Sequence, residues 1–421
     1  MLFRKKTEPA PAPIGPLPLA EIGDELARLL ENESDGVIRT LDLIVAQAEY
    51  HRASDIHLEP WQDALAVRFR IDGLLHNVAR IAKRHQERLV ARVKVLAKLV
   101  VYQKDAPQDG SIGSEATPCG QAMRVATFPT VYGEKAVLRL LGARDRLLPL
   151  DGLGFRRDVV TGLRAFGARP QGTFLLTGPS SSGKTTTIYA LLREIVAARN
   201  ESAHVVTIED PVEYRLGAIA QTEVNPQAGF TFQAALRAIL RQDPEVIMVG
   251  EIRDADTART AVQAGLTGHL VISTIHSGAA AGVFTRLLDM GVEPFLIASS
   301  VSGVLAQRLI RINCPHCLAD YAPEPALLAQ FKQAAAIHTF KRGAGCERCQ
   351  GIGFRGRTAI GETLMVDEKM ADLILTRPRT RTLHTTAVEN GMATLVDNGI
   401  ERVKDGTTTL EELRRVLPGP L

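Results

Sequence analysis

The chain has 421 residues and a mass of 45.6 kDa, enough for about three domains at roughly 150 residues each. Hydrophobic residues make up 45% and charged residues 23%, which is typical of a globular protein and excludes a generally disordered chain. A formal net charge of +3 does not by itself argue for binding to nucleic acid, which prefers a concentrated basic stripe. The sequence has no run of about 20 apolar residues that would predict a membrane span.

The first part of the chain is expected to be a tail followed by a mixed domain. Residues 1–36 predict a flexible, proline-rich tail and a short helix, because five prolines fall between Pro9 and Pro18. The next segment, residues 37–143, predicts a smaller α+β domain. Its expected elements are helices over residues 37–50 and 89–100, strands over 65–71 and 135–141, and an Asp72-Gly73 turn.

The pattern changes after residues 144–171, which are expected to form a linker and the helix that leads into the next domain. Short apolar strands then alternate with helices, which predicts a parallel sheet covered on both faces. This core is expected over residues 172–312, a cysteine module over 313–360, and a helical region over 361–421. The expected strands of the core are residues 173–177, 204–208, 245–249 and 269–274.

A phosphate-binding motif follows the first of these strands. Residues 178–185, GPSSSGKT, match the pattern G-x-x-x-x-G-K-[ST], and a helix is expected over 186–198. Lys184 would reach the β- and γ-phosphates of a nucleotide, and the Thr185 hydroxyl would bind Mg²⁺. The residues expected to bind nucleotide in this stretch are Gly178, Pro179, Ser180, Ser181, Ser182, Gly183, Lys184, Thr185 and Thr186.

Ionisable residues follow the other three strands of the expected core. The residues concerned are Glu209, Asp210, Glu213, Glu251 and His276. Because the carboxyl ends of parallel strands meet at one edge of a sheet, these side chains are expected beside the phosphate loop. Carboxylates there would hold the metal and orient water, and His276 could sense the γ-phosphate. The alternative for each is an ordinary surface residue.

Two pairs of cysteines predict a metal site. Cys314 and Cys317, and Cys346 and Cys349, form two CxxC loops, and four thiolates close a tetrahedral zinc site of structural character. Two redox pairs are the alternative. Cys119 is left over and is expected to be an unreactive thiol; five cysteines in a chain of this length favour a reducing, cytosolic setting.

Taken in order, these motifs resemble those of the secretion and pilus-assembly ATPases. That family has a P-loop, an acidic box, a Walker B segment and a histidine box, which here are GPSSSGKT, TIEDPVEY, VIMVGEIRD and TIHS. Further similar stretches are ASDIHLEP, PQDG, FPTVYGEKAVLRLL, AQRLIRINCPHC and residues 391–416. The resemblance covers roughly residues 37–417 and is strongest to the type II secretion motors (general secretory pathway protein E) and the pilus extension motors. The cysteine module argues against a retraction-type motor.

The resemblance implies an α/β fold, with a RecA-like P-loop ATPase domain preceded by a smaller α+β (PAS-like) domain. It implies a homohexamer that uses ATP, Mg²⁺ and Zn²⁺. The ring would lie on the cytoplasmic face of a bacterial inner membrane, attached peripherally through platform proteins and without nucleic acid.

The resemblance also implies roles for particular residues. Glu213 would act on the attacking water, and Glu251 would serve the metal and water network. Arginines from neighbouring domains or subunits would complete the site, and Arg124, Arg237 and Arg241 match them. The last two are four residues apart on a helix expected over residues 232–241. Solvated surface positions are the alternative for these arginines.

Three departures from the family pattern bear on function. Asp105 and Ser111 occupy places where the family usually has arginines, and the histidine box continues as residues 277–279, SGA. The third is that only about 36 residues are expected before the α+β domain, where secretion motors generally carry a platform-docking domain. Two alternative functions stay open: a P-loop nucleic-acid translocase, which an aromatic content of 5% opposes, and a non-hydrolysing assembly partner.

Overall fold

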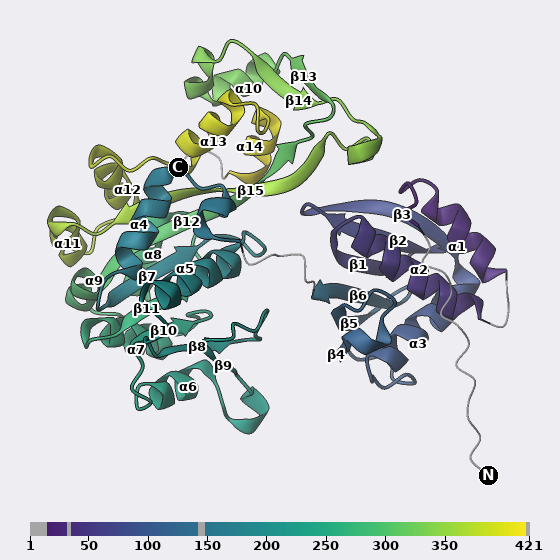
Figure 1. Cartoon of the computed structure of the whole chain (residues 1–421), viewed down its shortest axis with the longest axis horizontal. Coiled ribbons are helices and arrows are strands. Elements are labelled where there is room, and N and C mark those ends of the chain that lie inside the picture. The colour runs from purple at the N-terminus through teal and green to yellow at the C-terminus, as the bar shows by residue number, and fades with distance from the viewer. Residues whose placement is uncertain (1–14, 32–34, 142–147, 418–421) are drawn as a thin grey trace. The chain divides into compact units, whose positions relative to one another are not determined.

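The computed structural model describes residues 15–31, 35–141 and 148–417 of the chain. It divides into two compact units between residues 144 and 145 (Figure 1). Residues 1–14 and 32–34 of the predicted N-terminal segment lie outside the described residues, as do residues 142–147, where the predicted α+β domain ends and the predicted linker begins.

The first unit is an α+β domain built on one antiparallel sheet of order β3-β2-β1-β6-β5-β4. Side chains such as Ile56 and Leu58 are fully buried and pack with Leu41 and Ile44 into one core. The strands are β1 (Ala53–Pro60), β2 (Ala64–Ile71), β3 (Leu74–Ala82), β4 (Gln108–Ile112), β5 (Ala122–Thr130) and β6 (Gly133–Leu141). The helices are α1 (Ile22–Leu30), α2 (Gly36–Tyr50) and α3 (Gln86–Leu96).

The predicted helix over residues 89–100 was too long at its C-terminal end. Helix α3 ends at Leu96, and Lys98 adopts a left-handed backbone with φ of 58°. The Leu99 N–H then donates to the Lys94 carbonyl, which is a common way for a helix to terminate. A left-handed residue cannot be foreseen at a lysine, since its side chain does not favour that conformation.

The second unit contains a seven-stranded sheet of order β15-β12-β7-β11-β10-β8-β9. All neighbours in it are parallel except β15, which runs antiparallel to β12. The four predicted strands are present as β7 (Gly172–Thr177), β8 (Val205–Glu209), β10 (Val246–Val249) and β11 (Leu270–Thr274). Three further strands are β9 (Ala220–Glu223), β12 (Val301–Asn313) and β15 (Phe354–Met365).

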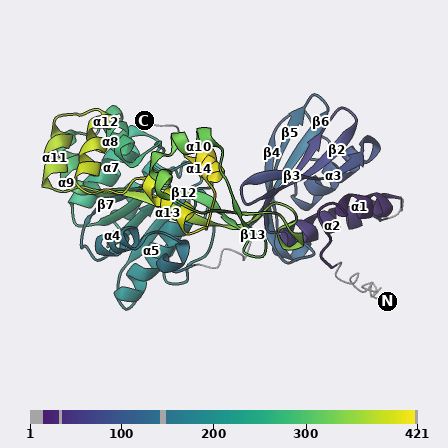
Figure 2. The ribbon, with the colours of Figure 1, turned by 90° about the horizontal axis from the view of Figure 1, so that it is seen from above.

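Helices cover both faces of this sheet, as a buried parallel sheet requires. Phe174 and Leu176 of β7 pack with α4 (Arg157–Gly167) and α5 (Lys184–Ala198), whereas Leu175 belongs to the core on the other face. Figure 2 shows α4 and α5 across β7 from α7 and α8. The helices of that second face are α6 (Phe232–Ile239), α7 (Ala255–Leu266), α8 (Ala280–Asp289) and α9 (Pro294–Ser300).

The C-terminal part of the unit contains the cysteines and short helices. Strands β13 (Leu318–Tyr321) and β14 (Phe340–Gly343) form a small antiparallel pair. The predicted boundary after residue 360 falls inside β15, which extends from the cysteine region into the main sheet. The helices are α10 (Pro325–Gln330), α11 (Glu368–Leu375), α12 (Thr380–Glu389), α13 (Leu395–Lys404) and α14 (Leu410–Val416). Across the described ranges, no helix combines the length and apolar composition needed to cross a membrane.

Candidate nucleotide site and cysteine cluster

The phosphate loop joins the end of β7 to the start of α5. Gly178 and Gly183 have φ of 151° and 87°, in the region that favours glycine. A Cβ atom at Gly178 would lie only 2.5 Å from the carbonyl oxygen of Gln307, so a larger residue does not fit there. Helix α5 begins directly after the loop at Lys184, and a helix N-terminus favours bound anions.

Lys184 extends its ammonium group over this loop. Its Nζ donates to the carbonyl oxygens of Gly178, at 2.9 Å, and Pro179, at 3.0 Å. Burial lowers the pKa of Lys184; Glu251 opposes this shift and Arg308 adds to it. An anionic phosphate at the loop would offset the cost of holding this charge in a partly buried place.

The ionisable residues predicted from sequence lie around one hollow at the carboxyl ends of β7, β8, β10 and β11. Its lining includes Phe232 and Arg253 in addition to predicted site residues. The predicted residues that line it are Ser180, Lys184, Thr185, Glu209, Asp210, Glu213, Glu251 and His276. Gly178, Pro179, Ser181, Ser182, Gly183 and Thr186 make up the rest of the loop and the first turn of α5.

Glu251 connects the segments after β10 and β11. Its Oε1 lies 2.9 Å from Nε2 of His276, and its Oε2 accepts a hydrogen bond of 2.7 Å from Arg253 Nε. The Walker B and histidine segments are therefore in direct side-chain contact. Sequence reasoning did not select Arg253, although it lies within the VIMVGEIRD segment, two residues after Glu251.

Glu209 is only 3% exposed, and protein donors occupy its carboxylate. Tyr189 of α5 donates to Oε2, while Thr207 and Gln221 donate to Oε1 at 2.6 Å and 3.1 Å. The Tyr189 hydroxyl also accepts a 3.3 Å hydrogen bond from the Glu213 N–H. Tyr189 was missed from sequence; its position five residues after Lys184, on the inner side of the same helix, was the available signal.

A polar pair on β12 lies against the phosphate loop. Gln307 Nε2 donates to the Ser182 carbonyl at 2.7 Å, and Arg308 Nη2 donates to the Gly278 carbonyl at 2.7 Å. Both side chains are buried, and burial lowers the pKa of Arg308. Sequence reasoning missed them because it did not recognise residues 301–313 as a strand.

Two of the three predicted arginines belong to the second unit, but they do not line the hollow. Arg237 is exposed on α6, and neither it nor Arg241 is among the described residues that line the hollow. The expectation that Arg241 lies on the same helix was wrong, because α6 ends at Ile239 and the Arg241 N–H bonds to Ala238 in a tighter turn. Arg124 belongs to the first unit, on β5, where it is paired with Ser111 of β4.

The four cysteines form one cluster whose dimensions fit zinc. The Sγ atoms of Cys314 and Cys346 are 3.9 Å apart, and Cys349 lies 3.7 Å from both Cys317 and Cys346. Zn–S bonds of about 2.3 Å place the thiolates of a tetrahedral site about 3.8 Å apart. All four ligand atoms lie within 4.8 Å of one another.

The backbone around the cluster favours thiolates, the form that binds metal. Burial alone would raise the pKa of Cys349, but N–H groups of Cys346 and Gly353 donate to its sulfur and lower that pKa to about 7. Burial and the neighbouring thiols raise the pKa of Cys317, and the Gly345 N–H, which donates to its sulfur, opposes that rise. The donor set therefore fits a closed structural zinc site.

Together the fold and the site define a P-loop nucleoside triphosphatase of α/β class that carries a tetracysteine module. The family model for type II/IV secretion system proteins matches residues 31–415, and the chain belongs to this family. The predicted family and the α/β fold class are thereby confirmed.

Similar proteins include two named ATPases. The type II secretion system ATPase E of Vibrio cholerae is 43% identical over 409 residues, covering 94% of this chain and 79% of that protein. The type IV pilus assembly ATPase PilB of Thermus thermophilus is 41% identical over 414 residues, covering 95% of this chain and 46% of that protein.

Solved structures are similar as well. The pilus retraction motor PilT with bound ADP has a TM-score of 0.60 at 27% identity and covers 90% of this chain and 97% of its own. The ATPase DotB of Legionella pneumophila shares the fold, with a TM-score of 0.65 at 18% identity. The match covers 89% of this chain and 94% of the DotB chain.

Proposed function

We propose that this protein is an ATP-hydrolysing motor of type II secretion or type IV pilus assembly. The observation that carries the proposal is that Lys184, Thr185, Glu213 and Glu251 line one hollow at the ends of neighbouring strands. These residues supply the phosphate, metal and water functions that hydrolysis of a nucleoside triphosphate requires. The names of the relatives supply the process.

The proposed chemistry depends on charge placed where the transition state needs it. Lys184 neutralises negative charge on the phosphates, and Glu213 accepts a proton from the attacking water. Thr185 and Glu251 would hold Mg²⁺, which supplies further positive charge beside the phosphates when bound. Glu251 is itself held by His276 and Arg253, so movement of either segment would change its orientation.

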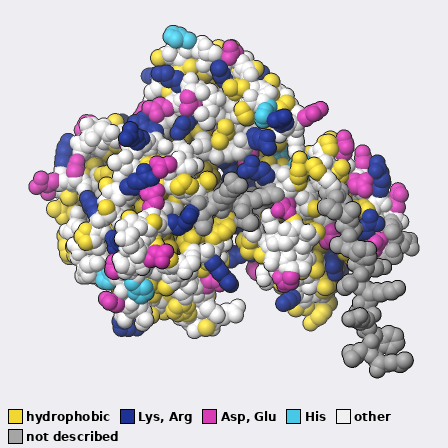
Figure 3. Space-filling model, viewed as in Figure 1, with side chains coloured by type: hydrophobic (Ala, Val, Ile, Leu, Met, Phe, Trp, Pro, Cys, Tyr) yellow, Lys and Arg dark blue, Asp and Glu magenta, His cyan; other side chains and the backbone are white. Residues whose placement is uncertain are grey.

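The proposed assembly is a homohexameric ring attached peripherally to the cytoplasmic face of a bacterial inner membrane through platform proteins. Arg237, Arg241 and Arg124 would reach a phosphate from a neighbouring subunit or domain. Nucleic acid is not an expected partner: among the described residues of each unit, basic and acidic side chains are interspersed on the face drawn in Figure 3. The zinc of the cysteine module would be structural.

The deciding experiment measures Mg²⁺-dependent ATP hydrolysis by the full chain and by Lys184→Ala. Loss of the ammonium is expected to lower turnover by about 10²-fold or more. Lys404→Ala, at an exposed position on α13, is the matched control and should hydrolyse ATP like the wild type. Full turnover by Lys184→Ala would overturn the assignment of the site.

Two further measurements distinguish the proposed motor from the two alternative functions. Strong stimulation of hydrolysis by DNA or RNA would favour a nucleic-acid translocase. Tight ATP binding without any hydrolysis by the wild type would favour a non-hydrolysing assembly partner.

A further inference from the structure

We propose that Tyr189 is a positioning residue for ATP hydrolysis and that it acts through Glu213. The inference rests on the proposed function, because it concerns the residue that would activate the attacking water. Its basis is a set of hydrogen bonds that connect the phosphate-binding helix α5 to the loop that carries Glu213.

Side chains hold the backbone of this loop, which runs from β8 to β9. The Val212 N–H donates to Glu223 at 3.1 Å, and the Leu216 N–H donates to Gln221 at 2.6 Å. Between them, the Glu213 N–H donates to the Tyr189 hydroxyl at 3.3 Å. The first two acceptors are on β9, at the loop's own end, whereas Tyr189 comes from α5.

The orientation of the Tyr189 hydroxyl is set by Glu209. The hydroxyl donates its proton to Glu209 Oε2, so its oxygen is left to accept from the Glu213 N–H. Glu209 is fixed in turn by Thr207 and Gln221. Burial and the neighbouring Glu209 carboxylate raise the pKa of Tyr189, so the phenol stays protonated and keeps donating at neutral pH.

Helix α5 therefore controls two parts of the reaction at once. Its first residues, Lys184 and Thr185, line the hollow for the phosphates, and Tyr189 lies about 7.5 Å further along the same helix. Tyr189 is 1% exposed, so its ring cannot move freely. The distance between the phosphates and the Glu213 backbone is thus set through one rigid element.

Loss of the Tyr189 hydroxyl should therefore affect catalysis but not the binding of ATP. Removal of the Tyr189 hydroxyl leaves the phosphate loop intact but releases the Glu213 N–H, so the carboxylate is held less well. Displacement of a catalytic group by about 1 Å can cost about 10²-fold in rate. The same change should not directly alter the affinity for ATP.

The test compares Tyr189→Phe with Tyr321→Phe in the full chain. Tyr321 makes the same kind of contacts away from the hollow: its hydroxyl donates to Glu411 at 2.8 Å and accepts from the Leu410 N–H at 3.4 Å. We expect kcat to fall about 10-fold or more in Tyr189→Phe, with KM and the Kd for ATP within about 2-fold of wild type. Tyr321→Phe should keep the wild-type kcat. Equal kcat in wild type and Tyr189→Phe would overturn the inference.

A double-mutant cycle tests whether Tyr189 acts through Glu213. In single-turnover assays, Tyr189→Phe should have little further effect in a Glu213→Gln background, because the group that it positions is already lost. An equal fold-loss in both backgrounds would overturn the inference.

If Tyr189→Phe does not fold, judged by its melting temperature and zinc content, Glu209→Gln serves instead. This substitution weakens the hydrogen bond that Tyr189 donates to residue 209, and the two side chains have nearly the same volume. It should also lower kcat at constant KM. An unchanged kcat would overturn the inference. A wild-type chain that does not hydrolyse ATP would instead overturn the proposed function itself.

Discussion

Glu213 is the side chain whose chemical role can be tested most directly. It lies exposed on the rim of the hollow, with its backbone held by Tyr189. Glu213→Gln should still bind ATP, because the phosphate loop is untouched, but should hydrolyse it about 10²-fold or more slowly, since an amide cannot accept a proton from water.

Binding of a fluorescent ATP analogue and single-turnover hydrolysis measure the two effects separately. Glu201→Gln, an exposed glutamate in the turn after α5, is the control and should behave as the wild type. Turnover by Glu213→Gln equal to that of wild type would remove Glu213 from the role of base.

At the scale of elements, helix α14 is anchored by a buried charge. Glu412 has a side chain that is 0% exposed and accepts hydrogen bonds from Arg311 of β12 and from Arg415. Burial would raise its pKa, but the hydrogen bonds from Arg415 and Arg311 lower it below the ordinary 4.5. Loss of one partner of a buried ion pair costs about 3 kcal/mol or more.

The sign of the pH effect follows from the lowered pKa. The stabilisation by Glu412 is complete above its ordinary pKa and is lost as pH falls through the lower value in the folded state. The hydrogen-exchange protection factors of residues 410–417, which are corrected for the pH dependence of intrinsic exchange, should therefore fall as pH drops below the ordinary value of 4.5. In Glu412→Gln these amides should have lower protection factors at pH 7, and the factors should depend less on pH, whereas the exposed Glu411→Gln should resemble wild type. An identical pH dependence in Glu412→Gln and wild type would contradict this account.

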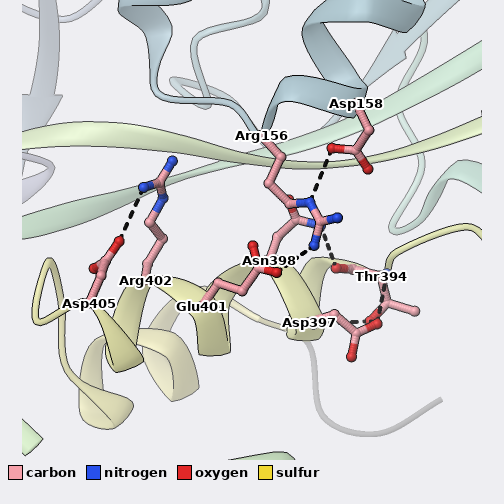
Figure 4. A network of polar contacts seen from close by, with 8 residues as sticks. All are labelled: Arg156, Asp158, Thr394, Asp397, Asn398, Glu401, Arg402 and Asp405. Atoms are coloured by element: carbon pink, nitrogen blue, oxygen red, sulfur yellow. Dashed lines mark hydrogen bonds and ion pairs between the residues drawn. The ribbon is translucent and has the colours of Figure 1, made fainter.

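One exposed ion pair, which Figure 4 draws, and one hydrogen bond connect α13 to the segment just before α4. Arg156 Nη1 lies 2.7 Å from Glu401, and Arg402 Nη2 donates to the Gly154 carbonyl at 2.6 Å. Pairs of this exposure contribute at most about 1 kcal/mol each. Their effect is to fix the position of the C-terminal helices, whereas the buried core under those helices supplies most of the stability.

The cysteine module should depend on its metal. We expect one zinc per chain, and Cys346→Ser should lose it, with faster hydrogen exchange in residues 313–353 and little change in the P-loop sheet. Cys119→Ser is the matched control, because burial and nearby Glu49 raise the pKa of Cys119 to about 11, and it lies outside the cluster. Thiolates must be deprotonated to bind, so zinc affinity should fall with falling pH. Absence of zinc from protein purified under reducing conditions without chelators would favour redox pairs instead.

At the scale of the whole molecule, the exposed Arg237 predicts that activity requires assembly. It lies outside the hollow of its own subunit, so it would contact a phosphate from a neighbour, and a head-to-tail interface of that kind closes into a ring. Hydrolysis per chain should rise with protein concentration in parallel with the assembled fraction in sedimentation. A fully active monomer would contradict the proposal.

Mixed rings give a stricter test of this arrangement. Lys184→Ala and Arg237→Ala should each be inactive alone, yet a mixture should regain part of the activity, because some interfaces then combine an intact Lys184 with an intact Arg237. No recovery in rings shown to exchange subunits would place Arg237 outside the neighbouring site.

The features of this protein that could be predicted from its sequence are those whose signals are local. The P-loop spacing, the two CxxC loops and the apolar runs of β7, β8, β10 and β11 each depend on residues within a few positions of one another. From parallel strands alone, it followed that the residues after those strands would meet at one edge.

The contacts that hold these parts together could not be predicted from local patterns and are evident in the folded structure. Strands β12 and β15 pair with each other and β12 with β7, and neither carries a strong local pattern because glycine and polar residues interrupt its apolar residues. The contacts of Tyr189 with Glu209 and Glu213, and of Glu251 with His276, join segments about 20 to 25 residues apart in the chain. Their geometry depends on strand order and on helix packing across the sheet, which no local spacing of residue types specifies.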